Sequence, residues 1–270
     1  MSEAEKNSPE LAESEPNHIQ MSFLDHLAEL RRRLIFIVLS VLVMMMVSFV
    51  FSNSIIKLLL YPPMLIPNIK PPIEMMRPVI TQVQGLMMVK IQVGLISGII
   101  LSLPIILFQL WRFISPGLRK KERRYAIPII LSATICFIIG ALFSFLIVIP
   151  ITLNFLLTMG DIDKELGIII ENMIDLDAYL SFVSGFMLIT GLTFELPVLS
   201  FFLTKIGVLN HKFLRTYWRH ASIACLVVAA IVTPTTDMIT LFVVAAPMII
   251  LYEISIWVSM ITGRKKAKDE

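Results

Sequence analysis

Hydrophobic and polar positions alternate along the chain in long blocks. Six apolar runs are separated by short polar stretches, and most runs have about 18 residues or more, which is enough to cross a bilayer as a helix. The pattern predicts an all-α integral membrane protein with six transmembrane helices. The expected helices cover residues 34–51, 86–110, 126–149, 179–203, 220–233 and 238–261.

The polar stretches between these runs alternate in charge. The first, third, fifth and seventh stretches hold 18 of the 23 lysines and arginines, whereas the second, fourth and sixth hold 4. Cytoplasmic loops of membrane proteins are enriched in Lys and Arg, so both termini are expected in the cytoplasm. The stretch 150–178 carries six acids against a lone Lys164 and should face outward.

The composition supports the same class. The chain is 57% hydrophobic and 16% charged, well below the ~25% charged residues of soluble domains. The net charge of +3 is small, and the basic loops indicate membrane topology and lipid headgroup contacts, with no nucleic-acid surface. The expected location is the cytoplasmic (inner) membrane. Cys136 and Cys225 lie inside apolar runs and are expected to be small hydrophobic residues without a disulfide.

Two tails and one long segment outside the six runs have informative compositions. Residues 1–20 are polar and acidic and predict a disordered tail with no cleavable signal, and residues 263–270 form a basic tail. The segment 53–83 contains six prolines, which exclude a regular helix through most of it. Its apolar residues favour a folded cap on the outer surface.

Prolines and one short run modify the helices. Pro104 is expected to kink the second helix, and Pro197 lies inside the fourth. The fifth run has only about 12 strongly apolar residues, which cover roughly 18 Å of a ~30 Å hydrocarbon core. The last two helices are therefore predicted to be a short pair.

Glu195 is a carboxylate well inside the fourth apolar run. An acid at such a depth costs ~2.5–3.5 kcal/mol on insertion scales, so it should face protein or water rather than lipid. A functional role is favoured. The structural alternative is a hydrogen bond to another helix, with Gln109 as a plausible partner.

Three further acids have ordinary interpretations from their spacing. An apolar stripe from Phe23 to Leu34 predicts an amphipathic helix that leads into the first crossing, and on it Glu29 favours an i, i+4 pair with Arg33. Glu122, alone among five bases, indicates a surface charge neutraliser. Asp237 is placed to cap the last helix.

Catalytic and metal-binding signals are not found in the sequence. It contains no zinc-protease, nucleophile-elbow or phosphate-loop motif, and its four histidines have no metal-ligand spacing. We therefore expect no enzymatic activity, no cofactor and no metal.

Four stretches in order resemble the TatC family, the polytopic subunit of the twin-arginine protein translocase. The match extends from residue 22 to about residue 257, and the segment before the last helix departs from the family's pattern by one inserted residue. The matching stretches are His26–Arg31, Phe113–Leu118 with Glu122–Arg124, Phe194–Pro197, and Thr233-Pro234 with Asp237, Pro247 and Leu251–Glu253.

The resemblance implies a receptor for signal peptides that carry two consecutive arginines on folded export cargo. It places Glu29 and Glu122 in the twin-arginine site, with Arg31, Gln109 and Phe113 in or beside it. A guanidinium matches a carboxylate bidentately, which gives the two acids a shared purpose.

The resemblance also implies partners and further sites. It implies kinked helices that form a concave groove for the signal peptide or partner helices, and Glu195, Pro197 and Asp237 would belong to this groove. The outer cap would hold a sensitive position at Pro62 or Pro63. Expected partners are TatA- and TatB-type single-span subunits and further copies of the chain in a multimeric complex, with the proton motive force as the energy source.

Two other functions stay open from the residues alone. One is a proton-coupled small-solute transporter with Glu195 as its relay, although no paired repeats support it. The other is a structural membrane scaffold, which would tolerate alanine at Glu29 and Glu122.

Overall fold

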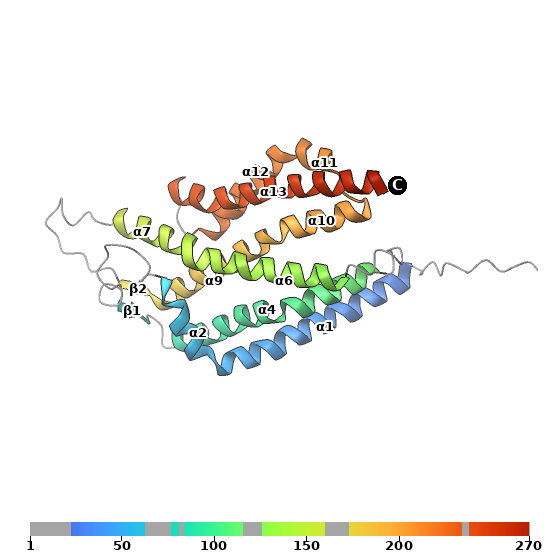
Figure 1. Cartoon of the computed structure of the whole chain (residues 1–270). Coiled ribbons are helices and arrows are strands. Elements are labelled where there is room, and N and C mark those ends of the chain that lie inside the picture. Colours follow the sequence, from blue (N-terminus) through green and yellow to red (C-terminus); the bar gives the residue numbers. More distant parts are fainter. Residues whose placement is uncertain are drawn as a thin grey trace, which may run out of the picture.

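In the computed structural model, long helices lie side by side in a bundle (Figure 1). The structure describes residues 23–62, 77–80, 84–115, 126–159, 173–233 and 238–269. This part of the chain confirms the all-α polytopic membrane fold, because it has five spans long and apolar enough to cross a membrane and one shorter apolar helix. The five spans are Leu27–Val50, Gly85–Ile114, Ala126–Leu156, Leu176–Ile206 and Thr240–Gly263, and the shorter helix is Trp218–Ile231.

Helices α1 (Phe23–Val50) and α4 (Gly85–Ile114) form an antiparallel pair at one edge of the bundle (Figure 1). Helix α1 is continuous, so the predicted amphipathic lead-in and the first crossing are one element. Small residues allow the close approach, since a Cβ added at Gly98 of α4 would lie 2.7 Å from the backbone of Met45. Most of the remaining surface of α1 is exposed, as expected of a helix that faces lipid.

The third crossing is built from three consecutive helical pieces. Helix α6 (Ala126–Phe143) passes through a π-helical turn, η3 (Ser144–Val148), into α7 (Ile149–Met159).

The fourth crossing is interrupted at Glu195, between α9 (Leu176–Phe194) and α10 (Leu196–Ile206). Pro197 lacks the N–H that would bond the carbonyl of Thr193, so the regular ladder cannot continue there. The Glu195 N–H instead donates to the Leu192 carbonyl at 3.1 Å. Pro104 differs, because α4 stays helical through it.

The two halves of the fourth crossing pack against different helices. Helix α9 meets α6 through two reciprocal glycine–phenylalanine contacts, Gly140 with Phe194 and Gly191 with Phe137, and a Cβ at either glycine would come within 2.7 Å of the ring. Helix α10 instead packs on α13 (Met238–Asp269).

Buried hydroxyl groups hold α10 against α13. The Ser200 hydroxyl donates to the Ser255 carbonyl at 2.8 Å, and the hydroxyls of Thr204 and Ser259 hydrogen bond at 2.7 Å. Such short polar side chains let transmembrane helices approach closely and hydrogen bond across the contact.

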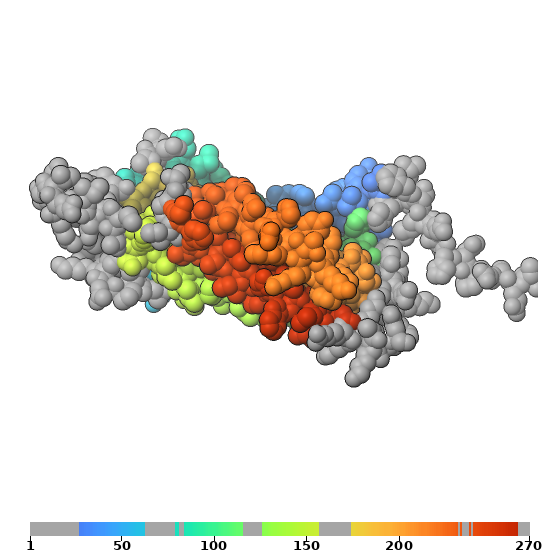
Figure 2. Space-filling model, turned by 90° about the horizontal axis from the view of Figure 1, so that it is seen from above, coloured from blue at the N-terminus to red at the C-terminus, as the bar shows by residue number. Residues whose placement is uncertain are grey.

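Helix α11 (His211–Thr216) and helix α12 (Trp218–Val232) precede α13. Helix α12 has 15 residues and α13 has 32. The predicted shortness of the final pair is therefore confined to α12, and α13 continues as helix through most of the expected basic tail. Seen from above, the orange and red segments cover the near face of the molecule, and the blue α1 shows only at its edge (Figure 2).

A small cap lies at one end of the bundle (Figure 1). This end is opposite the one that holds the start of α1 and the labelled C terminus. Helix α2 (Ser52–Leu59) and strand β1 (Arg77–Val79) come from the proline-rich segment, and β1 pairs in parallel with β2 (Met173–Asp175). This pairing confirms that the described part of the segment is folded.

The cap is fastened to the core of the bundle. The Tyr179 hydroxyl of α9 donates to the Leu59 carbonyl at 3.0 Å, and Pro62 is fully buried. The core beneath is formed by fully buried side chains from α4, α7, α9 and α13, among them Val93, Ile149, Leu180 and Ala245.

Candidate binding site

A polar cluster lies where the first turns of α1 approach the last turns of α4. The Arg33 side chain donates through Nε to Glu29 Oε1 at 3.1 Å, and Nη2 contacts the same oxygen. Through Nη1 it also donates to Gln109 Oε1 at 3.4 Å. One guanidinium therefore joins a carboxylate on α1 to an amide on α4.

The Glu29–Arg33 pair is largely shielded from solvent, with side-chain exposures of 18% for Glu29 and 14% for Arg33. Only one carboxylate oxygen is used, because Glu29 Oε2 is buried without a hydrogen-bond partner among the described residues. A buried acceptor without a donor is costly, and an ionised carboxylate accepts hydrogen bonds only. The cluster is thus suited to receive a further cationic donor.

Other expected site residues lie at different positions around this cluster. Phe113 is half-buried one turn beyond Gln109, on the same face of α4. Arg31 is exposed and lines a shallow groove along α1, away from the face that carries Glu29 and Arg33. Glu122 lies outside the described residues.

The groove along α1 is formed by apolar side chains on one stripe of the helix. Its volume is about 540 Å³, and Arg31 is the charged member of its lining. The lining residues are Leu27, Leu30, Arg31, Leu34, Ile35, Val38, Leu39 and Leu42.

Glu195 lies at a second polar position, in the interruption between α9 and α10. The side chain is half-buried, and its Oε1 atom is buried without a hydrogen-bond partner in the described part of the chain. The hydrogen bond to Gln109 considered from the sequence is wrong, because Gln109 belongs to the Arg33 cluster on another helix pair.

Of the four remaining expected site positions, the structure describes Pro197 and Pro62. Pro197 lies in the first turn of α10, two residues after Glu195, and accounts for the interruption there. Pro62 is buried in the cap that α2 and the two strands form. Pro63 and Asp237 lie outside the described residues, so the proposed capping role of Asp237 stays a prediction.

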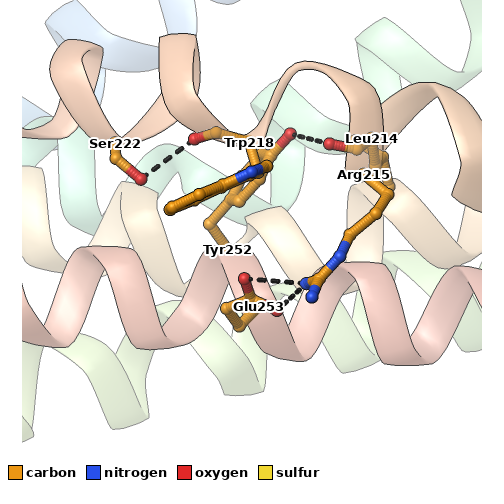
Figure 3. Close-up of polar contacts among 6 residues, drawn as sticks. All are labelled: Leu214, Arg215, Trp218, Ser222, Tyr252 and Glu253. Carbon is orange, nitrogen blue, oxygen red and sulfur yellow. Dashed lines mark hydrogen bonds and ion pairs between the residues drawn. The ribbon is translucent and has the colours of Figure 1, made fainter.

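A third polar cluster joins α11 to α13 (Figure 3). Arg215 Nη1 donates to both carboxylate oxygens of Glu253, at 3.1 Å and 2.9 Å. The Tyr252 hydroxyl donates to the Leu214 carbonyl at 2.8 Å. Neither contact was predicted from the sequence, although basic residues in 204–220 and Glu253 inside an apolar run were visible signals.

Arg33 is the residue whose connecting role the sequence did not indicate. Its spacing predicted the pair with Glu29, which the structure confirms. The contact with Gln109 depends on the packing of α1 against α4, and no local pattern could have indicated it.

Comparisons with known proteins agree with this architecture. A family model described as Sec-independent protein translocase protein (TatC) matches residues 25–247. The chain is 34% identical over 246 residues to the Sec-independent protein translocase protein TatC of Deinococcus radiodurans, covering 91% of this chain and 88% of that protein. It is 33% identical over 250 residues to the protein of the same name in Carboxydothermus hydrogenoformans, covering 93% and 97%.

Solved structures give the same result in three dimensions. A crystal structure titled twin arginine translocase receptor TatC superposes with a TM-score of 0.75 at 31% identity, covering 87% of this chain and 97% of that one. A second crystal structure, of the same receptor in DDM, gives a TM-score of 0.76 at 32% identity, covering 87% and 99%.

Proposed function

Because the chain belongs to the TatC family of Sec-independent protein translocase proteins, we propose that it is the subunit that recognises paired-arginine signal peptides. Membership makes the chain a multi-pass membrane component of the twin-arginine translocase, a transport subunit rather than a catalyst. The signal peptide, its binding site and the energy source belong to the proposal.

The unpaired oxygen of Glu29 is the observation that carries the proposal. It is buried, lies beside Arg33 and Gln109, and has no donor among the described residues. An arginine of the signal peptide would bond this oxygen and could displace Arg33 from the other. Charge-assisted bonds of this kind are the strong class of hydrogen bond.

The polar stretch after α4 supplies the second acid. Glu122 lies in the loop that follows Phe113, so the loop can bring it toward the end of α4 from which it emerges. We propose that Glu29 and Glu122 each receive one arginine. Gln109 and Phe113 would contact the intervening backbone and side chains, and Arg31 would flank the site.

The wider assembly follows the same assignment. We propose that both termini lie in the cytoplasm, that the protein is located in the cytoplasmic membrane, and that the proton motive force drives export. TatA- and TatB-type single-span subunits and further copies of the chain would complete the complex, with Glu195 in a groove for the signal peptide or a partner helix. The family assignment replaces the small-solute transporter considered from Glu195 alone.

Photocrosslinking from positions beside the two acids tests the proposal. A photoreactive residue at Ala28 or Lys121 leaves Glu29 and Glu122 intact and should capture a signal peptide that carries Arg-Arg. The same peptide with Lys-Lys should be captured less, because a lysine ammonium cannot pair bidentately with a carboxylate.

A photoreactive residue at Leu58 is the matched control. It is exposed on α2, at the opposite end of the bundle, and should capture neither peptide. Capture from Leu58 but not from Ala28 would reject the proposed site.

A further inference from the structure

The segment from α11 into the first turn of α12 exposes basic and aromatic side chains together. Residues 204–220 contain four lysines and arginines and no acid. Phe213, Tyr217 and Trp218 are 55%, 47% and 41% exposed, and the Phe213 and Tyr217 rings pack with their centroids 4.6 Å apart. We call the exposed set the basic aromatic surface: Lys212, Phe213, Tyr217, Trp218, Arg219 and His220.

Polar contacts hold α11, which carries part of this surface, against α13 (Figure 3). Arg215 and Leu214 are bonded to Glu253 and Tyr252, which lie inside the apolar span Thr240–Gly263. About 15 Å of apolar helix, at ~1.5 Å per residue, therefore extends from Glu253 to the end of that span. The surface lies beside the middle of α13 rather than at its end.

The charges at this depth are only partly compensated inside the protein. Arg215 has Glu253 as its partner, but neither Lys212 nor Arg219 has an ion-pair partner among the described residues. Cations at membrane depth are costly unless they meet an anion or water. Exposed Trp and Tyr side chains are typical of the headgroup level of a bilayer.

The length of α12 agrees with headgroups at this level. Its 15 residues cover about 22 Å, short of a ~30 Å hydrocarbon core. Local thinning of the bilayer is one way in which a membrane accommodates so short a span, and it would bring the headgroups down to the first turn of α12. In Figure 2 the orange residues of this segment form part of the near surface of the molecule.

We infer that the basic aromatic surface is a binding site for anionic phospholipid headgroups. Lys212 and Arg219 pair with lipid phosphates, and Trp218 and Tyr217 insert between the headgroups and the upper acyl chains. The ion pair of Arg215 with Glu253 holds α11 so that this surface is formed before lipid binds. The inference does not depend on signal-peptide recognition.

Fluorescence quenching by brominated lipid tests the site directly. The chain has three tryptophans, and the full chain with Trp111→Phe and Trp257→Phe retains only Trp218. It is reconstituted in phosphatidylcholine vesicles that contain brominated phosphatidylglycerol or, at equal mole fraction, brominated phosphatidylcholine. One cation near a membrane surface enriches anionic lipid by roughly fivefold, so brominated phosphatidylglycerol should quench Trp218 more strongly.

Charge variants separate the site from a general attraction. Lys212→Gln and Arg219→Gln should each lower the ratio of the two quenching efficiencies, and together they should bring it close to one. Lys57→Gln removes an exposed cation on α2 and should leave the ratio unchanged. Added salt at about 1 M should lower the ratio in the parent protein.

Two results would overturn the inference. One is equal quenching by both brominated lipids in the parent protein, which would leave a protein or peptide partner as the occupant of the surface. The other is an unchanged ratio in the double variant, provided that it elutes and melts like the parent. Because each single variant alone should already shift the ratio, poor folding of the double variant does not prevent the test.

Discussion

Glu29→Gln is the most direct test of the proposed arginine site. The substitution keeps the shape of the side chain but removes its charge and replaces one acceptor oxygen by a donor amide. In the structure Arg33 bonds Oε1 at 3.1 Å, and Oε2 is buried without a partner. The change therefore removes the acceptor that an incoming arginine would use.

The expected loss of affinity can be estimated from that one bond. A hydrogen bond to a charged group contributes about 1.5–3 kcal/mol, which corresponds to about 10- to 150-fold in Kd. Arg33 would lose its charge partner as well and repel the arriving arginine, which acts in the same direction. Gln109 still bonds Arg33, so we expect the folded state to persist with slightly lower stability.

Fluorescence anisotropy with labelled signal peptides measures this effect on protein in lipid nanodiscs. We expect Arg-Arg peptide to bind Glu29→Gln more weakly, and the preference for Arg-Arg over Lys-Lys peptide to decrease. Glu253→Gln is the matched control, because it breaks the ion pair with Arg215 on other helices. Unchanged binding by folded Glu29→Gln, or an equal loss in Glu253→Gln, would refute the reasoning.

Three further predictions test topology, Glu195 and helix packing. Cysteine at position 120 should be protected from an impermeant reagent added outside, and cysteine at 163 should be labelled; the reverse would reject the proposed orientation. If Glu195 works as a neutral hydrogen-bond donor, Glu195→Leu should reduce export about tenfold more than Glu195→Gln, because the amide keeps the hydrogen-bonding groups; similar losses of export in the two variants would show that it works as an anion instead. Gly98→Ala should lower the free energy of unfolding by about 1–3 kcal/mol and lower the melting temperature with it, because its Cβ would lie 2.7 Å from the backbone of α1. Gly185→Ala, where a Cβ meets nothing within 4 Å, should melt unchanged, and similar melting of both variants would show that the contact can relax.

The number and order of the membrane spans could be predicted from the sequence. Insertion into a bilayer depends on hydropathy summed over about 20 residues and on the charge of the flanking loops, and both are properties of local sequence. Pro197 marked a weak point of the fourth crossing in the same local way, because proline removes a backbone donor. Only the structure showed that this crossing is interrupted there, whereas α4 stays continuous through Pro104. The Glu29–Arg33 pair followed from i, i+4 spacing alone.

The partners of the polar groups were decided only by the tertiary structure. Gln109 bonds Arg33 rather than Glu195, and Glu253 pairs with Arg215 at mid-depth of α13. The parallel pairing of residues 77–79 with 173–175 also joins two loops that showed no strand pattern. These contacts depend on which helices are neighbours and how each is rotated about its axis. Small residues such as Gly98 set that packing by close steric fit between segments far apart in the chain, which hydropathy and local spacing do not encode.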